Sequence, residues 1–358
     1  MASDPNWSAP QQLSFAGTGI QRVAMAAVGG VVHLVWTRDR TIFHATLAGG
    51  QWTPAARVAT GDQPVLAASD AGALVCAYTN VFLGNREVYV VTWDGAKWSL
   101  PQPVSHTTGG SYDPCACVGS DGTIHLAWAD TTPGESWIYY AARRNGVWTN
   151  APIPNGKGSR PSIAAVGGEV SVAWQDRRAA TGRYDILATS RPDAEWTLPH
   201  LVSDAPEVHS LFGQIATSTR GHCHLIWQEE RDQVFVIRHA DRWATGWATP
   251  IDVSDPAVDA RLARALPNRH GLFQFIWSEG AQLRHRVRPG EPNATWWEPE
   301  LACEQCEDVG EFAAALSPED GQLHVVFTRF AANGARELFY LRRRAIERKK
   351  TFLPQISS

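Results

Sequence analysis

The chain has 358 residues, of which 44% are hydrophobic and only 19% are charged, and its formal net charge is −4. This charge gives no electrostatic reason to expect nucleic-acid binding, and no run of 18 apolar residues predicts a membrane span. With 16 Trp, 30 Gly and 22 Pro, the composition is typical of an all-β protein with a large core and many turns.

The first seven residues contain no basic region followed by an apolar segment, so no secretory signal is predicted. Six cysteines are present, and they do not recur at a regular interval: Cys76, Cys115, Cys117, Cys223, Cys303 and Cys306. Disulfide-dense secreted domains are usually much smaller than this chain. We therefore expect a cytoplasmic location, with secretion by another route as the alternative.

A tryptophan recurs every 45 to 51 residues along the chain, at Trp7, Trp52, Trp98, Trp148, Trp196, Trp247 and Trp297. Each opens a segment of the type Trp-x-x-Pro-x-x-Val-Ser, which residues 98–105 show most completely. The interval is that of a four-stranded propeller blade. The repeat therefore predicts the architecture of the whole chain.

Within each repeat the elements follow one order. A strand of small residues such as 161–166 comes first, and an alternating strand that ends in an aromatic residue comes second. A third strand such as 184–190 follows, and the Trp segment is the fourth. The aromatic residues that end the second strands form their own series: Trp36, Tyr78, Trp128, Trp174, Trp227, Trp277 and Phe327. First strands with small side chains fit the crowded centre of a propeller, where the blades converge.

The count of strands predicts a closed ring of seven blades. The last repeat ends after residues 337–341 without a Trp segment, whereas the first Trp segment stands alone at the N-terminus. We expect residues 6–14 to complete the seventh blade, which removes the exposed sheet edges. Residues 1–344 then form a single propeller domain, and residues 345–358 form a basic C-terminal tail.

The segments Val172–Arg178 and Tyr184–Ser190, followed by Trp196, resemble the repeats of the sialidase-like (BNR-repeat) propeller superfamily. Those repeats read Val-x-Trp-x-Asp-x-Arg, then Asp-Ile-x-x-x-Ser, then an Asp-box that ends in Thr-Trp. Here the Asp-box is shortened to turns such as Asp94–Trp98, so the chain resembles a divergent, seven-bladed member. The resemblance implies a propeller scaffold that lectins, hydrolases and acidic-polysaccharide lyases share.

Candidate ligand-binding residues lie where the first strands begin, because these positions meet at one mouth of the channel. The aligned positions are Arg22, Gln63, Asp113, Arg160, Phe212, Arg261 and Glu311. Arginine binds carboxylates and sulfates through two parallel hydrogen bonds. The sequence therefore predicts an anionic sugar, or another small anionic ligand, at this mouth.

Acid, base or nucleophilic chemistry at the same mouth has four candidates: Asp113, Glu311, Tyr112 and His209. In sialidase-like enzymes an arginine cluster holds the substrate carboxylate while Tyr, Glu and Asp carry out the reaction. The alternative is that these charged residues form salt bridges between blades along a solvated channel.

A second set of polar residues lies two positions after each aromatic of the second strands. Asp176 and Arg177 belong to its densest loops, and they are candidate ligand contacts. Recurrence at one repeat position also fits a structural role, such as pairing with a neighbouring loop. Trp137, outside both aromatic series, is a candidate for stacking on a sugar ring, and packing between blades is its alternative.

Neither the histidines nor the cysteines predict a metal site or a cofactor. His33, His125, His224 and His324 occupy one repeat position in the second strand, which indicates packing or hydrogen bonding inside the blades. Cys303 and Cys306 have the spacing of a zinc or redox pair, but no matched second pair accompanies them. A local disulfide or a lone thiol pair is the expectation.

Three functions follow from these residues. The first is a carbohydrate-binding propeller without catalysis. The second is a glycan-active enzyme, either a sialidase-like hydrolase or a polysaccharide lyase, that acts on an anionic sugar. The third is a protein-interaction scaffold. The sequence favours glycan binding and does not determine the oligomeric state.

Overall fold

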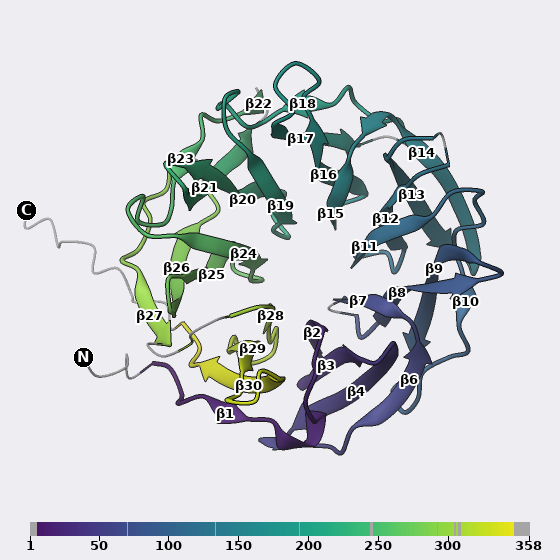
Figure 1. Cartoon of the computed structure of the whole chain (residues 1–358), viewed down its shortest axis with the longest axis vertical. Helices are drawn as coiled ribbons and strands as arrows, with labels where there is room; N and C mark the ends of the chain where they lie inside the picture. The colour runs from purple at the N-terminus through teal and green to yellow at the C-terminus, as the bar shows by residue number, and fades with distance from the viewer. Residues whose placement is uncertain are drawn as a thin grey trace, which may run out of the picture.

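The computed structural model describes residues 6–69, 71–132, 134–192, 194–243, 246–291, 293–303, 306 and 309–346. These residues form seven antiparallel sheets, arranged as blades around a central channel (Figure 1). The predicted all-β, seven-bladed propeller is therefore confirmed. Within these residues the helical structure is the short 3-10 element η1 (Ser14–Ala16), and no helix is long and apolar enough to cross a membrane.

The first four blades follow the predicted strand order, with the innermost strand first. Blade 1 contains β2 (Arg22–Val28), β3 (Val31–Arg38), β4 (Thr41–Ala48), β5 (Gln51–Trp52) and β6 (Ala56–Thr60). Blade 2 contains β7 (Asp62–Ala68), β8 (Leu74–Phe82), β9 (Asn85–Trp93) and β10 (Gln102–Pro103). Blade 3 contains β11 (Ser111–Val118), β12 (Ile124–Asp130), β13 (Trp137–Arg144) and β14 (Val147–Lys157). Blade 4 contains β15 (Ser159–Val166), β16 (Glu169–Arg177), β17 (Tyr184–Arg191) and β18 (His200–Leu201).

The last three blades repeat this order and close the ring. Blade 5 contains β19 (Ser210–Thr217), β20 (Cys223–Arg231), β21 (Val234–Trp243), β22 (Gly246–Trp247) and β23 (Ile251–Asp252). Blade 6 contains β24 (Ala260–Pro267), β25 (Leu272–Glu279), β26 (Gln282–Pro289) and β27 (Glu300–Cys303). Blade 7 contains β28 (Phe312–Leu316), β29 (Leu323–Phe330), β30 (Arg336–Arg343) and, from the N-terminal end, β1 (Gln11–Gln12).

The core lies between neighbouring blades, and the aromatic residues that end the second strands form its centre. All seven of these aromatic side chains are fully buried. The tryptophans of the fourth strands pack against the preceding blade: the Trp52 ring lies 5.4 Å from that of Tyr340, and the Trp196 ring lies 5.1 Å from that of Tyr140. These rings fill the space between blades that diverge toward the rim.

Blade 6 departs from the predicted tryptophan register by one residue. Trp297 is 40% exposed, whereas the Trp296 ring packs 4.8 Å from the Phe275 ring and 5.1 Å from the His239 ring of blade 5. The wedge between blades 5 and 6 is therefore Trp296. The two adjacent tryptophans are chemically identical, so sequence spacing alone selects the wrong one.

The N-terminal strand closes the ring, as predicted from the sequence. Gln11 and Gln12 of β1 pair with Tyr340 and Phe339 of β30, and Figure 1 shows β1 on the outer side of that strand. Trp7, which is 6% exposed, forms a further bridge to Arg343. The edge of blade 7 is thus covered by the other end of the chain.

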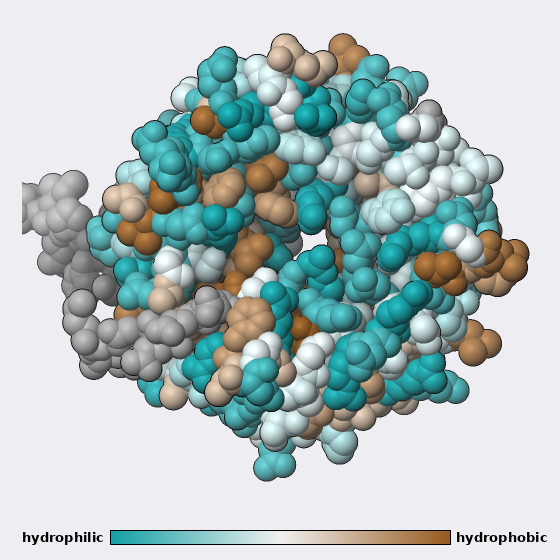
Figure 2. All heavy atoms as spheres, viewed as in Figure 1, coloured by the Kyte–Doolittle hydropathy of each residue, from teal (hydrophilic) through white to brown (hydrophobic). Residues whose placement is uncertain are grey.

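The propeller has two faces, which we name by the innermost strands. These strands begin on the top face, where the second and third strands are also joined. On the bottom face, tight turns join each first strand to its second strand. An opening lies at the centre of the ring, with hydrophilic residues on much of its rim (Figure 2).

Candidate functional site

The innermost strands of five blades have a β-bulge close to the top face. In each bulge one residue other than glycine has a positive φ of 49–57°: Gln63, Asp113, Arg160, Phe212 and Leu262. Such residues are uncommon outside special turns, and bulges redirect side chains near functional sites. All five residues line one cavity of about 520 Å³ at the top mouth, together with Arg22 and Glu311.

Two pairs of residues in this cavity are already joined to each other, one by hydrogen bonds and one by an ion pair. The Gln63 amide nitrogen donates to Oδ1 of Asp113 at 2.7 Å, and the backbone N–H of Asp113 donates to Oε1 of Gln63 at 3.2 Å. On the other side, Arg22 forms an ion pair with Glu311. The carboxylates are therefore held in place, and the charge of Arg22 is largely neutralised.

The Arg160 guanidinium has different contacts from that of Arg22. It lies 4.7 Å from the centre of the Phe212 ring, and no ion pair joins it to a carboxylate among the described residues. The backbone N–H of Phe212 in turn donates to Oε1 of Gln175 at 3.2 Å, which fixes the strand that carries the ring. The top mouth therefore offers a cation beside an aromatic surface.

Arg261 does not line this cavity, and the structure corrects the alignment that predicted it there. Leu262 occupies the equivalent bulge position, and Arg261 instead pairs with Asp259 at 2.6 Å while its guanidinium lies 4.4 Å from the Phe235 ring. Arg264 lines the cavity in its place. Burial lowers the pKa of Arg264, and the charge of Glu311 opposes that shift.

Tyr112 and His209 lie outside the lining of the cavity. Tyr112 is 40% exposed, and Arg86 lies 5.4 Å from its ring centre. The ring of His209 is 5.7 Å from that of Tyr184, and its Nδ1 accepts the backbone N–H of Tyr184 at 3.2 Å. In the neutral tautomer that this hydrogen bond requires, the ring proton is on Nε2, and a catalytic role of Tyr112 or His209 stays a prediction.

Asp176, Arg177 and Trp137 also lie outside the cavity. Oδ1 of Asp176 accepts the backbone N–H of Arg177 at 2.8 Å, and burial raises the pKa of Asp176. The Arg177 side chain donates to the backbone oxygen of Gly182 at 3.2 Å. Trp137 is half-buried at the start of β13, where it pairs with Lys157 of β14. Their role as ligand contacts stays a prediction.

Other residues at the same repeat position as Asp176 form hydrogen bonds inside their own blades. Oδ2 of Asp130 accepts the indole N–H of Trp128 at 3.1 Å, and Oε2 of Glu279 accepts that of Trp277 at 2.9 Å. Both carboxylates thus satisfy a buried donor of the core. This is the structural role that the sequence offered as the alternative.

The histidines of the second strands are bonded inside their blades. The ring nitrogens of His33 and His44 lie 3.0 Å apart, and Nδ1 of His125 lies 2.7 Å from the Tyr140 hydroxyl. Among the described residues, no group of three or more His, Cys, Asp or Glu side chains has the arrangement of a metal site. Cys303 and Cys306 form a disulfide.

Sequence reasoning did not find Gln175 and Gln228, which support the bulges of the next blades. Oε1 of Gln228 accepts the backbone N–H of Leu262 at 3.2 Å, as Gln175 does for Phe212. In both blades the glutamine directly follows the buried tryptophan of the second strand. That repeated Trp-Gln pair is a signal that the sequence contains.

Comparison with known proteins gives likeness of fold without likeness of sequence. No family model matches the chain, and no curated protein matches it. Among solved structures, a protein of unknown function from Dyadobacter fermentans is 14% identical, with a TM-score of 0.58, over 92% of this chain and 100% of that one.

Two glycan-active enzymes are also among the similar structures. A PL25 ulvan lyase bound to -[GlcA(1-4)Rha3S]- is 13% identical, with a TM-score of 0.61, over 91% of this chain and 95% of its own. The Hadza microbial sialidase Hz136 is 12% identical, with a TM-score of 0.52, over 87% of this chain and 76% of its own. The predicted resemblance to sialidase-like propellers is thus confirmed at the level of the fold.

Proposed function

We propose that the protein binds an acidic glycan at the top mouth of its channel. The observation that carries this proposal is the contact between Arg160 and Phe212 in a cavity of about 520 Å³. It places a cation that has no carboxylate partner among the described residues beside an aromatic ring. Ligand sites are commonly concave and combine apolar surface with a few placed polar groups.

Each group of the cavity matches one part of an acidic sugar. A uronate carboxylate or a sulfate accepts two hydrogen bonds from the guanidinium of Arg160. The C–H face of the sugar ring packs on Phe212. The carboxylates of Asp113 and Glu311 accept hydrogen bonds from sugar hydroxyls, since Gln63 and Arg22 hold them in position.

The similar structures support the glycan as the ligand class. The ulvan lyase was solved with -[GlcA(1-4)Rha3S]- bound, and a second polysaccharide lyase, Uly1, has a TM-score of 0.58 at 12% identity. At these identities the likeness concerns the fold, so the choice of an acidic ligand rests on Arg160.

Catalysis on the same glycan is the second candidate function. The observation in its favour is that Asp113 and Glu311 line the same cavity as Arg160. Two carboxylates beside a bound acidic sugar are the groups that hydrolysis or proton abstraction requires. Catalysis therefore uses the same site, and measurement of turnover separates it from binding alone.

The test is titration of the protein with trigalacturonate, with neutral maltotriose as the comparison. We expect the wild type to prefer trigalacturonate and Arg160→Gln to bind it about 10- to 100-fold more weakly, because a charge-assisted hydrogen-bond pair is lost. Calorimetry measures the affinity. Arg261→Gln is the matched control, since it removes the same charge on the same face outside the cavity, and we expect a change of less than about twofold.

Equal weakening by Arg160→Gln and Arg261→Gln would contradict a site at the top mouth. Asp113→Asn and Glu311→Gln then separate the two functions. Turnover of trigalacturonate that these changes abolish establishes an enzyme. Retained binding without turnover in the wild type establishes a binding protein.

A further inference from the structure

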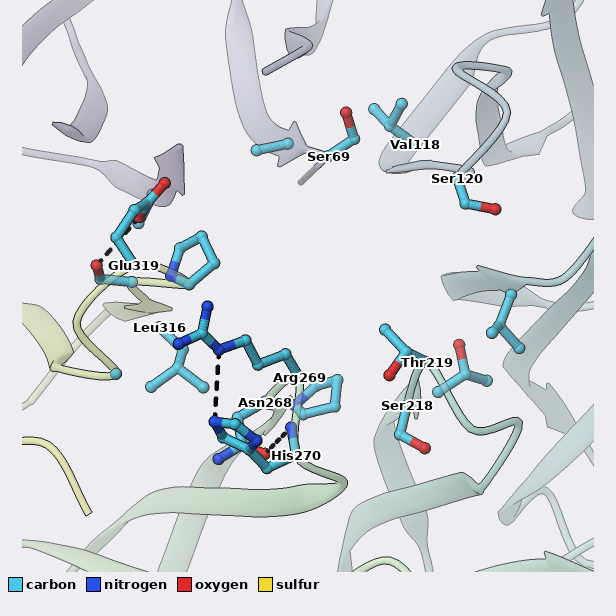
Figure 3. A pocket seen from close by; sticks show the side chains of 18 of the residues that line it. Ser69, Val118, Ser120, Ser218, Thr219, Asn268, Arg269, His270, Leu316 and Glu319 are labelled. Atoms are coloured by element: carbon cyan, nitrogen blue, oxygen red, sulfur yellow. Dashed lines mark hydrogen bonds between the residues drawn. The ribbon is translucent and has the colours of Figure 1, made fainter. Parts of the chain in front are cut away.

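The channel has a second and larger cavity at its bottom mouth. Its volume is about 840 Å³, and it is lined by the ends of the innermost strands and by the turns that follow them. The same strands begin at the top mouth, so the two cavities occupy opposite ends of one channel. Figure 3 shows this bottom cavity with Ser218 and Thr219 on one side and Leu316 and Glu319 on another.

Arg269 provides the bottom cavity with an available cation. It lies in the turn between β24 and β25, and its side chain extends over the cavity (Figure 3). Its Nε donates to Nε2 of His270 at 3.4 Å, and no ion pair joins it to a carboxylate of the described residues. Its terminal nitrogens thus retain their paired geometry for an anion.

The neighbouring turn on the same face carries an arginine that is paired with a carboxylate. Arg220, between β19 and β20, pairs with Glu291 at 3.4 Å and does not line the cavity. Both arginines are exposed and occupy turns that end in glycine. Arg269 therefore differs from Arg220 in its ion pairing and in its position at the cavity, and not in the type of turn that carries it.

The remaining walls of the bottom cavity present hydroxyls and carboxylates. Ser69, Ser120 and Thr219 contribute hydroxyl groups, whereas Ser218 is buried and its hydroxyl oxygen accepts the backbone N–H of Arg220 at 3.3 Å. Glu319 accepts the hydroxyl of Ser317 at 3.3 Å and has a second oxygen for another donor. A ligand that fits both Arg269 and this wall carries an anionic group and several hydroxyls.

We infer that the bottom mouth is a second binding site for an acidic oligosaccharide. The anionic group binds the Arg269 guanidinium, and the sugar hydroxyls bond to the serine, threonine and Glu319 side chains. A cavity of this volume is within the range that holds ligands larger than one sugar ring. This site goes beyond the proposed function, since it lies on the face opposite to Arg160 and shares none of its residues.

The experiment titrates the full chain with trigalacturonate and places both mouths under separate control. In an Arg160→Gln background we expect one binding event to remain, and Arg269→Gln to weaken it at least 10-fold. Arg220→Gln, the matched control, changes it by less than twofold. Maltotriose binds at least 10-fold more weakly than trigalacturonate, and inorganic sulfate competes with trigalacturonate at this site.

Each other outcome of this titration is decisive. If Arg160→Gln alone abolishes all binding, or if Arg269→Gln and Arg220→Gln have equal effects, the second site does not exist. If Arg160→Gln titrates as the wild type does while Arg269→Gln abolishes all binding, the proposed function at the top mouth fails and the bottom site stands. All three arginines are exposed, and thermal unfolding verifies that each variant is folded.

Discussion

Trp296 and Trp297 are adjacent in the chain but lie in different environments. The Trp296 ring is partly buried and packs against Phe275 and His239, and Arg286 lies 5.3 Å from its ring centre. Trp297 projects from the rim and is 40% exposed. Burial of a large aromatic ring supplies much more stability than an exposed ring does. At the scale of residues, the environment decides which side chain maintains the contact between blades.

We therefore expect Trp296→Ala to lower the free energy of unfolding by about 2–4 kcal/mol, since it leaves a cavity between blades 5 and 6. Trp297→Ala removes the same atoms from the rim, and its expected cost is below about 1 kcal/mol. Urea unfolding of the two variants measures both values. A larger loss for Trp297→Ala would contradict the assignment of Trp296 as the wedge.

At the scale of elements, the second and third strands are joined by buried polar pairs in addition to their ladders. Two of these pairs are His224 with His239, whose ring nitrogens lie 2.8 Å apart, and His324 with the Tyr340 hydroxyl, also at 2.8 Å. Burial lowers the pKa of His324 to about 4 and that of His224 to about 3. These strands therefore require neutral imidazole.

The pH dependence of stability follows from these pairs. Below pH 6.5 the unfolded chain takes up protons on its histidines, while the buried rings of the native state stay neutral until about pH 4. Each such histidine costs up to about 1.4 kcal/mol of stability per pH unit in that window. We expect full stability above pH 6.5 and progressive loss between pH 6.5 and 4, measured as unfolding midpoints in urea.

Blade 6 supplies the control for this prediction. Gln274 occupies the repeat position of the histidines, and its Oε1 lies 3.1 Å from the His285 ring. His125→Gln therefore preserves a hydrogen-bonding side chain opposite Tyr140 and removes one titrating group, for which burial lowers the pKa to about 4. We expect a shallower pH profile, and a profile identical to that of the wild type would contradict the role of this histidine.

At the scale of the whole molecule, the ends of the chain meet beside a buried ionic cluster. Glu300 of β27 pairs with Arg343 of β30 and accepts the Trp7 indole N–H at 3.3 Å. Burial raises the pKa of Glu300, but hydrogen bonds from Arg343 and His285 outweigh it and hold the pKa at about 2. One carboxylate thus connects blade 6, blade 7 and the N-terminal segment.

We expect Glu300→Gln to lower the free energy of unfolding by about 2–4 kcal/mol, because it leaves Arg343 buried without its counter-charge. Glu135→Gln is the matched control. It removes one member of the exposed pair between Glu135 and Lys157, and we expect a much smaller loss because solvent screens an exposed ion pair. Chemical denaturation measures both variants, and equal losses would show that the cluster does not stabilise the closure.

The site was predictable to the extent that it follows the repeat. Gln63, Asp113, Arg160 and Phe212 were aligned correctly because each directly precedes a proline or a glycine at the start of its innermost strand. Arg22 and Glu311 join them at the mouth. Arg261 was misplaced by one position because the bulge residue of blade 6, Leu262, precedes an alanine, whereas those of the other four bulged strands precede a proline or a glycine that marks the position. The ion pair of Arg22 with Glu311 joins the first and last blades, and no local pattern contains such a contact.

The number of blades, the order of strands and the closure by the N-terminal segment follow from the amino-acid pattern, because the period of buried residues is a local property of the chain. Which arginines keep an available charge depends on contacts between distant segments. Arg160 and Arg269 lack carboxylate partners among the described residues, whereas Arg22 and Arg220 have them. Pairing depends on distances between blades, and these are set when the ring closes.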